Sequence, residues 1–111
     1  MKVAVIGSRS FTDYDLVISI LDEFDISAVV SGGAKGADSL GEKYAIDNFI
    51  DTLIFKPDWK RYGRGAGFVR NKEIINNCDI VVAFWDGESK GTKNSIDLAR
   101  KQNKTVRIIS T

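Results

Sequence analysis

The 111-residue sequence contains no histidine, and cysteine and proline each occur only once. Without histidine the chain lacks the commonest acid–base residue of enzymes and the commonest zinc ligand. Its one cysteine, Cys78, cannot form a disulfide within the chain, and with no histidine to activate it we expect a buried, inert thiol. Any chemistry must therefore come from carboxylates, arginine, lysine or hydroxyl groups.

The sequence also lacks an excess of charge of either sign. Its formal net charge is +1, with opposite charges interleaved, so nucleic acid is not an expected partner. No apolar run is long enough to cross a bilayer and no signal-peptide pattern is present, so we expect a cytoplasmic protein. A chain of this length is expected to form a single domain over residues 1–111.

Apolar runs alternate with segments that carry apolar residues at helical spacing, a pattern that predicts strands and helices in turn. Strands are expected at about 2–6, 27–31, 51–55, 80–85 and 105–109, and helices at about 12–24, 35–50, 68–77 and 93–102. Residues 58–67 are expected to form a long irregular loop. The alternation predicts an α/β fold, a Rossmann-like three-layer sandwich with a five-stranded parallel sheet and helices on both faces.

The turn after the second predicted strand is unusually rich in glycine. It reads Ser31-Gly32-Gly33-Ala34-Lys35-Gly36-Ala37-Asp38 and leads into a helix. The free N–H groups and partial positive charge of a helix start favour an anion, and glycine lets that anion approach the backbone. The turn therefore predicts a phosphate or carboxylate cradle. A plain turn capped by Asp38 or Ser39 remains the alternative, since neither a Walker A loop nor a complete dinucleotide fingerprint is present.

Two more polar turns follow the first and fourth predicted strands, at Gly7-Ser8-Arg9-Ser10 and at residues 86–92. In a sheet of order 3-2-1-4-5 all three turns lie at neighbouring strand ends, whereas in order 2-1-3-4-5 the third strand separates the first from the fourth. We therefore expect the order 3-2-1-4-5 and a single ligand crevice. Arg9 would supply positive charge there, with a solvated surface arginine as the alternative.

Two residues outside these turns are candidates for the same site. Trp59 could stack on a base or could be packed beneath a loop. Asn71 lies with Phe68 and Ile75 on the inward stripe of the third predicted helix, and a buried amide there either holds a neighbouring loop or contacts a ligand. In the last predicted helix, Thr92 is expected to be the N-cap.

Taken together, these motifs resemble the YspA-like family of the SLOG superfamily, which is named after the Smf/DprA proteins and the Lonely Guy phosphoribohydrolases. The resemblance extends over nearly the whole chain and implies a Rossmann-like domain that binds a nucleotide or nucleotide-derived ligand, such as AMP, ADP-ribose or an NAD-like molecule, as a sensor or ligand-processing module. It is carried by Ile6-Gly7-Ser8-Arg9, Val30-Ser31-Gly32-Gly33-Ala34-Lys35-Gly36-Ala37-Asp38, Trp59 with Tyr62-Gly63, Ala66-Gly67 with Arg70-Asn71, and Phe84-Trp85-Asp86-Gly87 through Ser89-Lys90-Gly91-Thr92.

The resemblance also implies two alternative functions. One is hydrolysis of the N-glycosidic bond of nucleoside 5′-monophosphates, but the catalytic glutamate of those hydrolases falls on Ser95 here. Asp38 and Asp86 are then the candidate catalytic carboxylates. The other alternative is single-stranded DNA binding as in the Smf/DprA proteins, through the basic and aromatic residues Lys60, Arg61, Tyr62 and Arg64.

The predicted ligand-binding residues come from the three turns and from Trp59, Asn71 and the neighbouring cation Arg70 outside them. They are Gly7, Ser8, Arg9, Ser10, Gly32, Gly33, Ala34, Gly36, Asp38, Trp59, Arg70, Asn71, Asp86, Gly87, Ser89, Gly91 and Thr92. No dedicated metal site is expected, although Mg²⁺ could accompany a phosphate ligand. The resemblance further implies that a homo-oligomer is possible.

Overall fold

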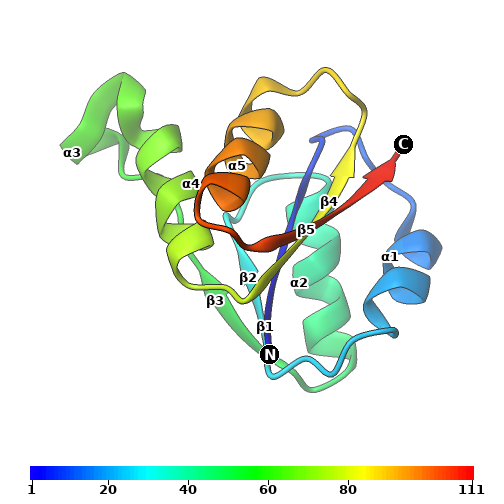
Figure 1. The fold of residues 1–111 in the computed structure, drawn as a ribbon. Coiled ribbons are helices and arrows are strands. Elements are labelled where there is room, and N and C mark those ends of the chain that lie inside the picture. The colour runs from blue at the N-terminus through cyan, green and yellow to red at the C-terminus, as the bar shows by residue number, and fades with distance from the viewer.

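The computed structural model describes residues 1–111 and contains one five-stranded parallel sheet between two layers of helices (Figure 1). The strands are β1 (Lys2–Gly7), β2 (Ala28–Ser31), β3 (Asp51–Ile54), β4 (Ile80–Trp85) and β5 (Thr105–Ser110). The helices are α1 (Tyr14–Leu21), α2 (Ala37–Asp47), α3 (Trp59–Tyr62), α4 (Ala66–Asn76) and α5 (Lys90–Lys101), with a 3-10 turn, η1, at Gly63–Gly65. The strand order is β3-β2-β1-β4-β5 and every pairing is parallel, which confirms the predicted order and fold class.

The two faces of the sheet are covered by different helices. On one face, α1 and α2 pack on the sheet around Val5, Val17 and Phe84. On the other face, α4 and α5 pack around Ile74 and Ile96. Strands β1 and β4 are therefore buried on both sides, as their near-continuous apolar runs predict. None of the helices combines the length and apolarity needed to cross a membrane.

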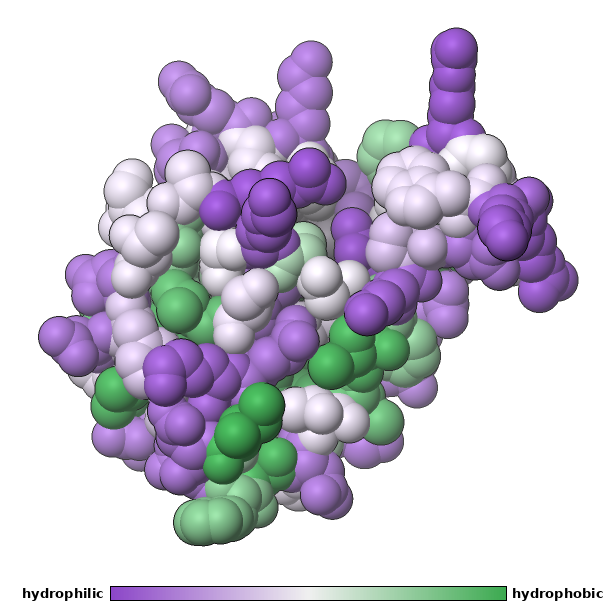
Figure 2. Space-filling view, turned by 180° about the vertical axis from the view of Figure 1, so that it is seen from behind, coloured by the Kyte–Doolittle hydropathy of each residue, from purple (hydrophilic) through white to green (hydrophobic).

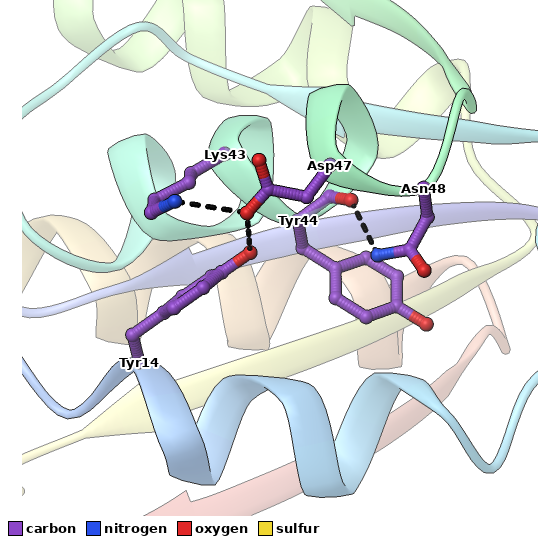
Figure 3. A network of polar contacts seen from close by, with 5 residues as sticks. All are labelled: Tyr14, Lys43, Tyr44, Asp47 and Asn48. Carbon is purple, nitrogen blue, oxygen red and sulfur yellow. Dashed lines mark hydrogen bonds and ion pairs between the residues drawn. The ribbon is translucent and has the colours of Figure 1, made fainter.

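Helices α1 and α2 are also joined by a polar network at the carboxyl end of α2 (Figure 3). The Tyr14 hydroxyl donates a hydrogen bond to Asp47 at 2.7 Å, and the Lys43 ammonium lies 2.8 Å from the same carboxylate oxygen. Burial and the hydrogen bond to Asp47 raise the pKa of Tyr14 to about 12. This network lies at the opposite end of α2 from the glycine turn, so it fixes the helix without entering the candidate site.

Residues 58–67 differ from the predicted irregular loop, because most of this segment is helical. The Asp58 carboxylate accepts a hydrogen bond from the Arg61 amide at 3.1 Å and so caps α3. The chain then continues through η1 directly into α4. In Figure 1 this segment projects from the body of the molecule, beside the start of α4.

Several helices begin at a residue other than the predicted one. In α1 the N-cap is Asp13, whose carboxylate accepts from the Leu16 amide at 3.1 Å. In α5 the N-cap is Ser89 and not Thr92, so the helix starts three residues earlier than expected. In α2 the cap position is taken by Gly36, without a side-chain hydrogen bond.

The predicted inward stripe of the third helix is wrong at one position. In α4 the side chain of Phe68 is 60% exposed, whereas Asn71 and Ile75 are buried as predicted. Cys78, which follows α4, is also buried, and this burial raises the pKa of its thiol. The thiol is therefore protonated and unreactive at neutral pH, as expected.

Candidate functional site

The turns after β1, β2 and β4 meet α4 and α5 around one hollow at the carboxyl edge of the sheet, which we call the inner pocket. Its cavity volume is about 70 Å³. It is lined by Ile6, Gly7, Arg9, Ala34, Asp38, Arg70, Asn71, Ile74, Ser89, Gly91, Thr92 and Ser95. Nine of these twelve residues belong to the predicted ligand-binding set, the others being Ile6, Ile74 and Ser95.

A second hollow, the outer groove, adjoins the inner pocket. It is lined by Arg9, Gly32, Gly33, Ala34, Lys35, Pro57, Trp59, Gly67 and Arg70. Three of these residues, Arg9, Ala34 and Arg70, line both hollows. The two arginines therefore lie where the inner pocket opens into the outer groove.

The amides of Gly32, Gly33 and Ala34 in the glycine turn already have acceptors within the protein. One oxygen of Asp38 accepts hydrogen bonds from the Gly32 amide at 3.0 Å and from the Ala34 amide at 3.4 Å. The Gly33 amide donates to the Ser31 hydroxyl at 3.3 Å. The buried Asp38 carboxylate thus takes up the amides of Gly32 and Ala34, and a bound phosphate would have to use other groups of the site.

Cationic side chains are available to contact a bound phosphate. The ion pairs of the protein involve Lys43, Lys93 and Arg107 only. Arg9 and Lys35 are exposed, and Arg70 is half-buried because it lies against the glycine turn. All three cations line the outer groove without a carboxylate in ion-pair contact, so they are free to contact a phosphate.

Arg70 and Asn71 connect the glycine turn to α5. The Arg70 guanidinium donates to the Gly32 carbonyl at 2.7 Å and to the Asn71 side-chain oxygen at 3.0 Å. The Asn71 amide group in turn donates to the Asn94 side chain at 3.1 Å and to the Gly91 carbonyl at 3.5 Å. Asn71 thus ties α4 to the first turn of the helix α5 and not to a loop, and it also lines the inner pocket, so a ligand contact of Asn71 stays a prediction.

Burial dominates the ionisation of the two charged groups beside this turn. It raises the pKa of Asp38 to about 6, although the amides of Gly32 and Ala34 and the charge of Arg70 act in the opposite direction. Burial also lowers the pKa of Arg70. Asp38 therefore changes its protonation within the range from weakly acidic to neutral pH, at the rim of a pocket that also contains a guanidinium.

Some of the predicted ligand-binding residues line neither the inner pocket nor the outer groove. Ser8, Ser10 and Asp86 line a separate hollow together with Phe11, Thr12, Asp13 and Thr111. The Asp86 carboxylate accepts from the amides of Ser89 and Glu88, at 2.9 and 2.8 Å, and these hydrogen bonds lower its pKa. Asp86 therefore stabilises its own turn and does not share a pocket with Asp38. Gly36 and Gly87 line none of the three hollows.

Several residues of the site were missed by the sequence reasoning. Lys35, Pro57 and Gly67 line the outer groove, and only Lys35 carried a signal, since it stands inside the glycine turn. Ser95 lines the inner pocket, at the position where the resemblance placed a glutamate. Trp59 is 59% exposed on the outer groove, which excludes the alternative that it is packed beneath a loop.

Comparison with known proteins agrees with this architecture. The profile of the YspA, cpYpsA-related SLOG family matches residues 1–62, more than half of the chain. The Gene 61 protein of Mycobacterium phage D29 is 33% identical over 111 aligned positions, which cover 90% of this chain and 89% of the phage protein. The chain belongs to the YspA, cpYpsA-related SLOG family. The segment that matches this SLOG family contains the turns after β1 and β2 and Trp59, which supply most of the outer groove.

Two solved structures share the fold of this SLOG protein. DNA processing protein A (DprA) from Streptococcus pneumoniae superposes with a TM-score of 0.81 at 24% identity, over 99% of this chain and 50% of that chain. DprA from Helicobacter pylori gives a TM-score of 0.76, also at 24% identity, over 100% of this chain and 66% of that chain. The protein thus spans about half the length of the first DprA and about two thirds of the second.

These likenesses correct one prediction. The H. pylori structure is described as revealing a unique single-stranded DNA binding mode, so the prediction that nucleic acid is not an expected partner of such a chain is wrong. That prediction rested on the net charge of +1. Net charge averages over the whole surface, whereas Arg9, Lys35 and Arg70 gather at one groove.

Proposed function

We propose that the protein binds single-stranded DNA in the outer groove, with phosphates beside Arg9, Lys35 and Arg70 and a base stacked on Trp59. The observation that carries the proposal is the largely exposed indole of Trp59 in the same groove as three cations without ion-pair partners. Binding sites for single strands combine a cationic path for the phosphates with aromatic rings for the bases. The fold shared with a DNA-binding DprA supports this choice.

The residues that follow Trp59 extend the same kind of surface. Lys60, Arg61, Tyr62 and Arg64 are all exposed on α3 and η1. The Arg61 guanidinium lies 5.1 Å from the centre of the Tyr62 ring, a distance typical of cation–π contact. A strand that leaves the outer groove along α3 would therefore meet further cations and another aromatic ring.

Fluorescence anisotropy with a labelled oligothymidylate, measured over a range of salt concentrations, tests the proposal. Three phosphate contacts on a single strand predict a slope of log K against log salt of about −2. Replacing Trp59 with Ala removes one stacking ring and is expected to weaken binding by roughly 1–3 kcal/mol. Because the indole is largely exposed, the fold should be unaffected.

Phe49→Ala is the matched control, since Phe49 is an exposed aromatic residue that lies beyond the carboxyl end of α2, away from the groove. Its replacement should leave binding unchanged. Equal losses in the Trp59 and Phe49 variants, or binding that is insensitive to salt, would contradict the proposal.

A small nucleotide is the second candidate ligand, because the inner pocket adjoins the phosphate-binding arginines and is lined mainly by polar groups. AMP, ADP-ribose or an NAD-like molecule would place its phosphate beside Arg9 and Arg70, and any Mg²⁺ would arrive with that phosphate. No cluster of three or more potential metal-ligating side chains is present. Calorimetry separates the two functions: a mononucleotide that binds as tightly as a long oligonucleotide favours the small ligand.

A further inference from the structure

The helix α3 is attached to the rest of the protein by very little packing. Neither α3 nor η1 contains a buried residue, and both aromatic side chains of α3, Trp59 and Tyr62, are exposed. The first buried residue that follows is Ala66, at the start of α4. In Figure 1 the segment stands out from the sheet and from its covering helices. Because few buried contacts hold α3, little free energy opposes its movement.

The turn η1, which joins α3 to α4, reads Gly63-Arg64-Gly65. Gly63 has φ 54° and ψ −131°, a conformation that glycine tolerates and other residues avoid. Gly65 has φ −81° and ψ −4°, and a Cβ atom at this position would have no other atom within 4 Å. Neither the backbone angles nor the packing therefore requires glycine at position 65. A glycine that sterics do not require, next to one that they do, is typical of a hinge.

The outer groove is lined by residues from both sides of this hinge. Pro57 and Trp59 precede η1 and belong to the projecting segment. Most of the other lining residues belong to the body of the protein, by which we mean the sheet and the helices other than α3. Arg70 is fixed to this body by its 2.7 Å hydrogen bond to the Gly32 carbonyl. A rotation of α3 at η1 would therefore move Trp59 and leave the glycine turn in place.

Phosphates and bases would contact different parts of the groove. The cations Arg9, Lys35 and Arg70 belong to the body, whereas the aromatic ring of the groove, Trp59, belongs to α3. The groove has a cavity volume of about 370 Å³, which is within the range of ligand pockets. A chain of phosphates can bind to the cations without any movement of α3. A base that stacks on Trp59 gains contacts when α3 closes, so it is the base that favours the closed position.

We propose that α3 is a lid, hinged at Gly63 and Gly65, that closes on an unpaired base in the outer groove and so distinguishes a single strand from other polyanions. In a duplex the bases are paired and stacked inside the helix, so Trp59 cannot reach their faces. The inference rests on the proposed binding of single-stranded DNA. It adds that recognition requires a movement of α3, and that bases and not phosphates cause this movement.

Distances between two nitroxide labels, measured by pulsed electron paramagnetic resonance, test the movement. Lys60→Cys places one label on α3, and Thr12→Cys places the other on the body, at an exposed position in the turn after β1. Cys78 is buried and its pKa is raised, so it does not compete for the label. Oligothymidylate is expected to shorten the distance. The labels at Thr12→Cys and Asp97→Cys, both on the body, are the matched control and should keep their distance.

Two further probes separate bases from phosphates. An oligomer of abasic sites with the same number of phosphates should bind to the cations without shortening the distance. A duplex of the same length should likewise leave α3 in the open position, because its bases offer no free face along its length.

Gly65→Ala tests the hinge. Alanine fits the backbone angles and the free space at this position, so it favours the open position seen in the structure. Alanine at a compatible glycine position changes an equilibrium constant by roughly two- to fivefold. Binding of oligothymidylate should weaken by that factor, whereas binding of the abasic oligomer should not change. Ser19→Ala is the matched control, because it raises helix propensity at an exposed position on α1, on the other side of the molecule from α3 (Figure 1).

The outcomes distinguish this inference from the proposed function. An unchanged distance with oligothymidylate bound would overturn the lid and leave groove binding intact. The same shortening with the abasic oligomer would overturn the role of the base. Unchanged binding of oligothymidylate by Gly65→Ala would show that α3 does not turn at η1, against the proposal. If no oligomer binds, both the inference and the proposed function are wrong.

Discussion

The Asp38 carboxylate faces the Gly32 amide across the glycine turn, with 3.0 Å between the oxygen and the nitrogen. Asp38 lies in the first turn of α2, and so its side chain holds the turn that leads into its own helix. The same oxygen accepts from the Ala34 amide. The shape of the turn therefore depends on a carboxylate that is 6% exposed and whose charge is disfavoured by burial.

Replacing Asp38 with Asn is expected to stabilise the protein more at pH 7.5 than at pH 4.5. Burial raises the pKa of Asp38 from 3.8 to about 6, so the folded protein binds this proton more tightly than the unfolded chain does. Stability therefore falls as the pH rises from about 4 to about 6 and is constant above that range. Asparagine keeps an acceptor for the Gly32 amide but carries no charge.

A pKa difference of this size corresponds to about 3 kcal/mol in the free energy of unfolding, as an upper limit for the gain at pH 7.5. Urea unfolding of both proteins at the two pH values measures it. The Asp47 and Asp86 carboxylates have lowered pKa values and remain ionised over this range, so they do not affect the comparison. An equal difference between the two proteins at both pH values would show that burial of the charge is not its cause.

Gly36→Ala is expected to destabilise the protein far more than Gly87→Ala. Both glycines have a positive φ, 77° and 83° respectively, which costs about 1–2 kcal/mol for any other residue. A Cβ atom at Gly36 would also collide with the carbonyl groups of Ser8 and Arg9. A Cβ atom at Gly87 would have no other atom within 4 Å. We expect about 1 kcal/mol for Gly87→Ala and about 3 kcal/mol or more for Gly36→Ala, measured by chemical denaturation. Similar losses at the two sites would mean that the turn after β1 can move away.

The sheet could be predicted from the sequence because its strands are apolar and its polar turns select one strand order. Helix starts were less predictable, since two adjacent polar residues such as Thr12 and Asp13 are both suitable caps. Which of them caps α1 depends on the local backbone, and it is Asp13 that accepts the Leu16 amide. The helical conformation of residues 58–67 was missed for a different reason: Gly63, Gly65 and Gly67 are typical of a loop, although Asp58 caps α3.

The candidate site was predictable only as far as the backbone alone positions its residues. Arg9 and the glycine turn follow neighbouring parallel strands, so their proximity follows from the strand order. The direction in which each carboxylate points does not follow from the strand order. Asp38 turns toward the Gly32 amide, whereas Asp86 turns toward the amides of its own loop. These side-chain conformations place the two candidate catalytic carboxylates in different hollows.

Arg9→Gln is expected to weaken oligonucleotide binding and to reduce its dependence on salt. Each phosphate contact on a single strand contributes about 0.7 to the slope of log K against log salt, so the slope should become less steep by about that amount. Arg100→Gln is the matched control, because Arg100 is exposed in the last turn of α5, at the opposite end of that helix from the site. The same change of slope in both variants would indicate that only the overall charge matters.

Replacing Phe49 with Gly is expected to stabilise the protein by roughly 0.5–1 kcal/mol. Phe49 follows α2 in a left-handed conformation with φ 57°, which is unfavourable for a phenylalanine. Its side chain is 99% exposed, and the Ile50 amide closes the helix end by donating to the Ala45 carbonyl at 2.8 Å. Glycine removes the strain and no buried contact is lost. The space-filling view shows separate hydrophobic patches across the middle and lower part of the molecule (Figure 2). Because Phe49 is exposed, its replacement by glycine also reduces the exposed apolar surface of the protein.

The end of α5 provides the control for that experiment. Asn103 has φ 58°, and the Lys104 amide donates to the Ala99 carbonyl at 2.9 Å, so the two helix ends share one geometry. Asparagine adopts this conformation more readily than phenylalanine does, so Asn103→Gly should gain less stability than Phe49→Gly. Both are measured by urea unfolding at one pH. A loss of stability in Phe49→Gly would mean that the ring, although exposed, makes contacts that hold the end of α2, and the strain would then not be its main effect on stability.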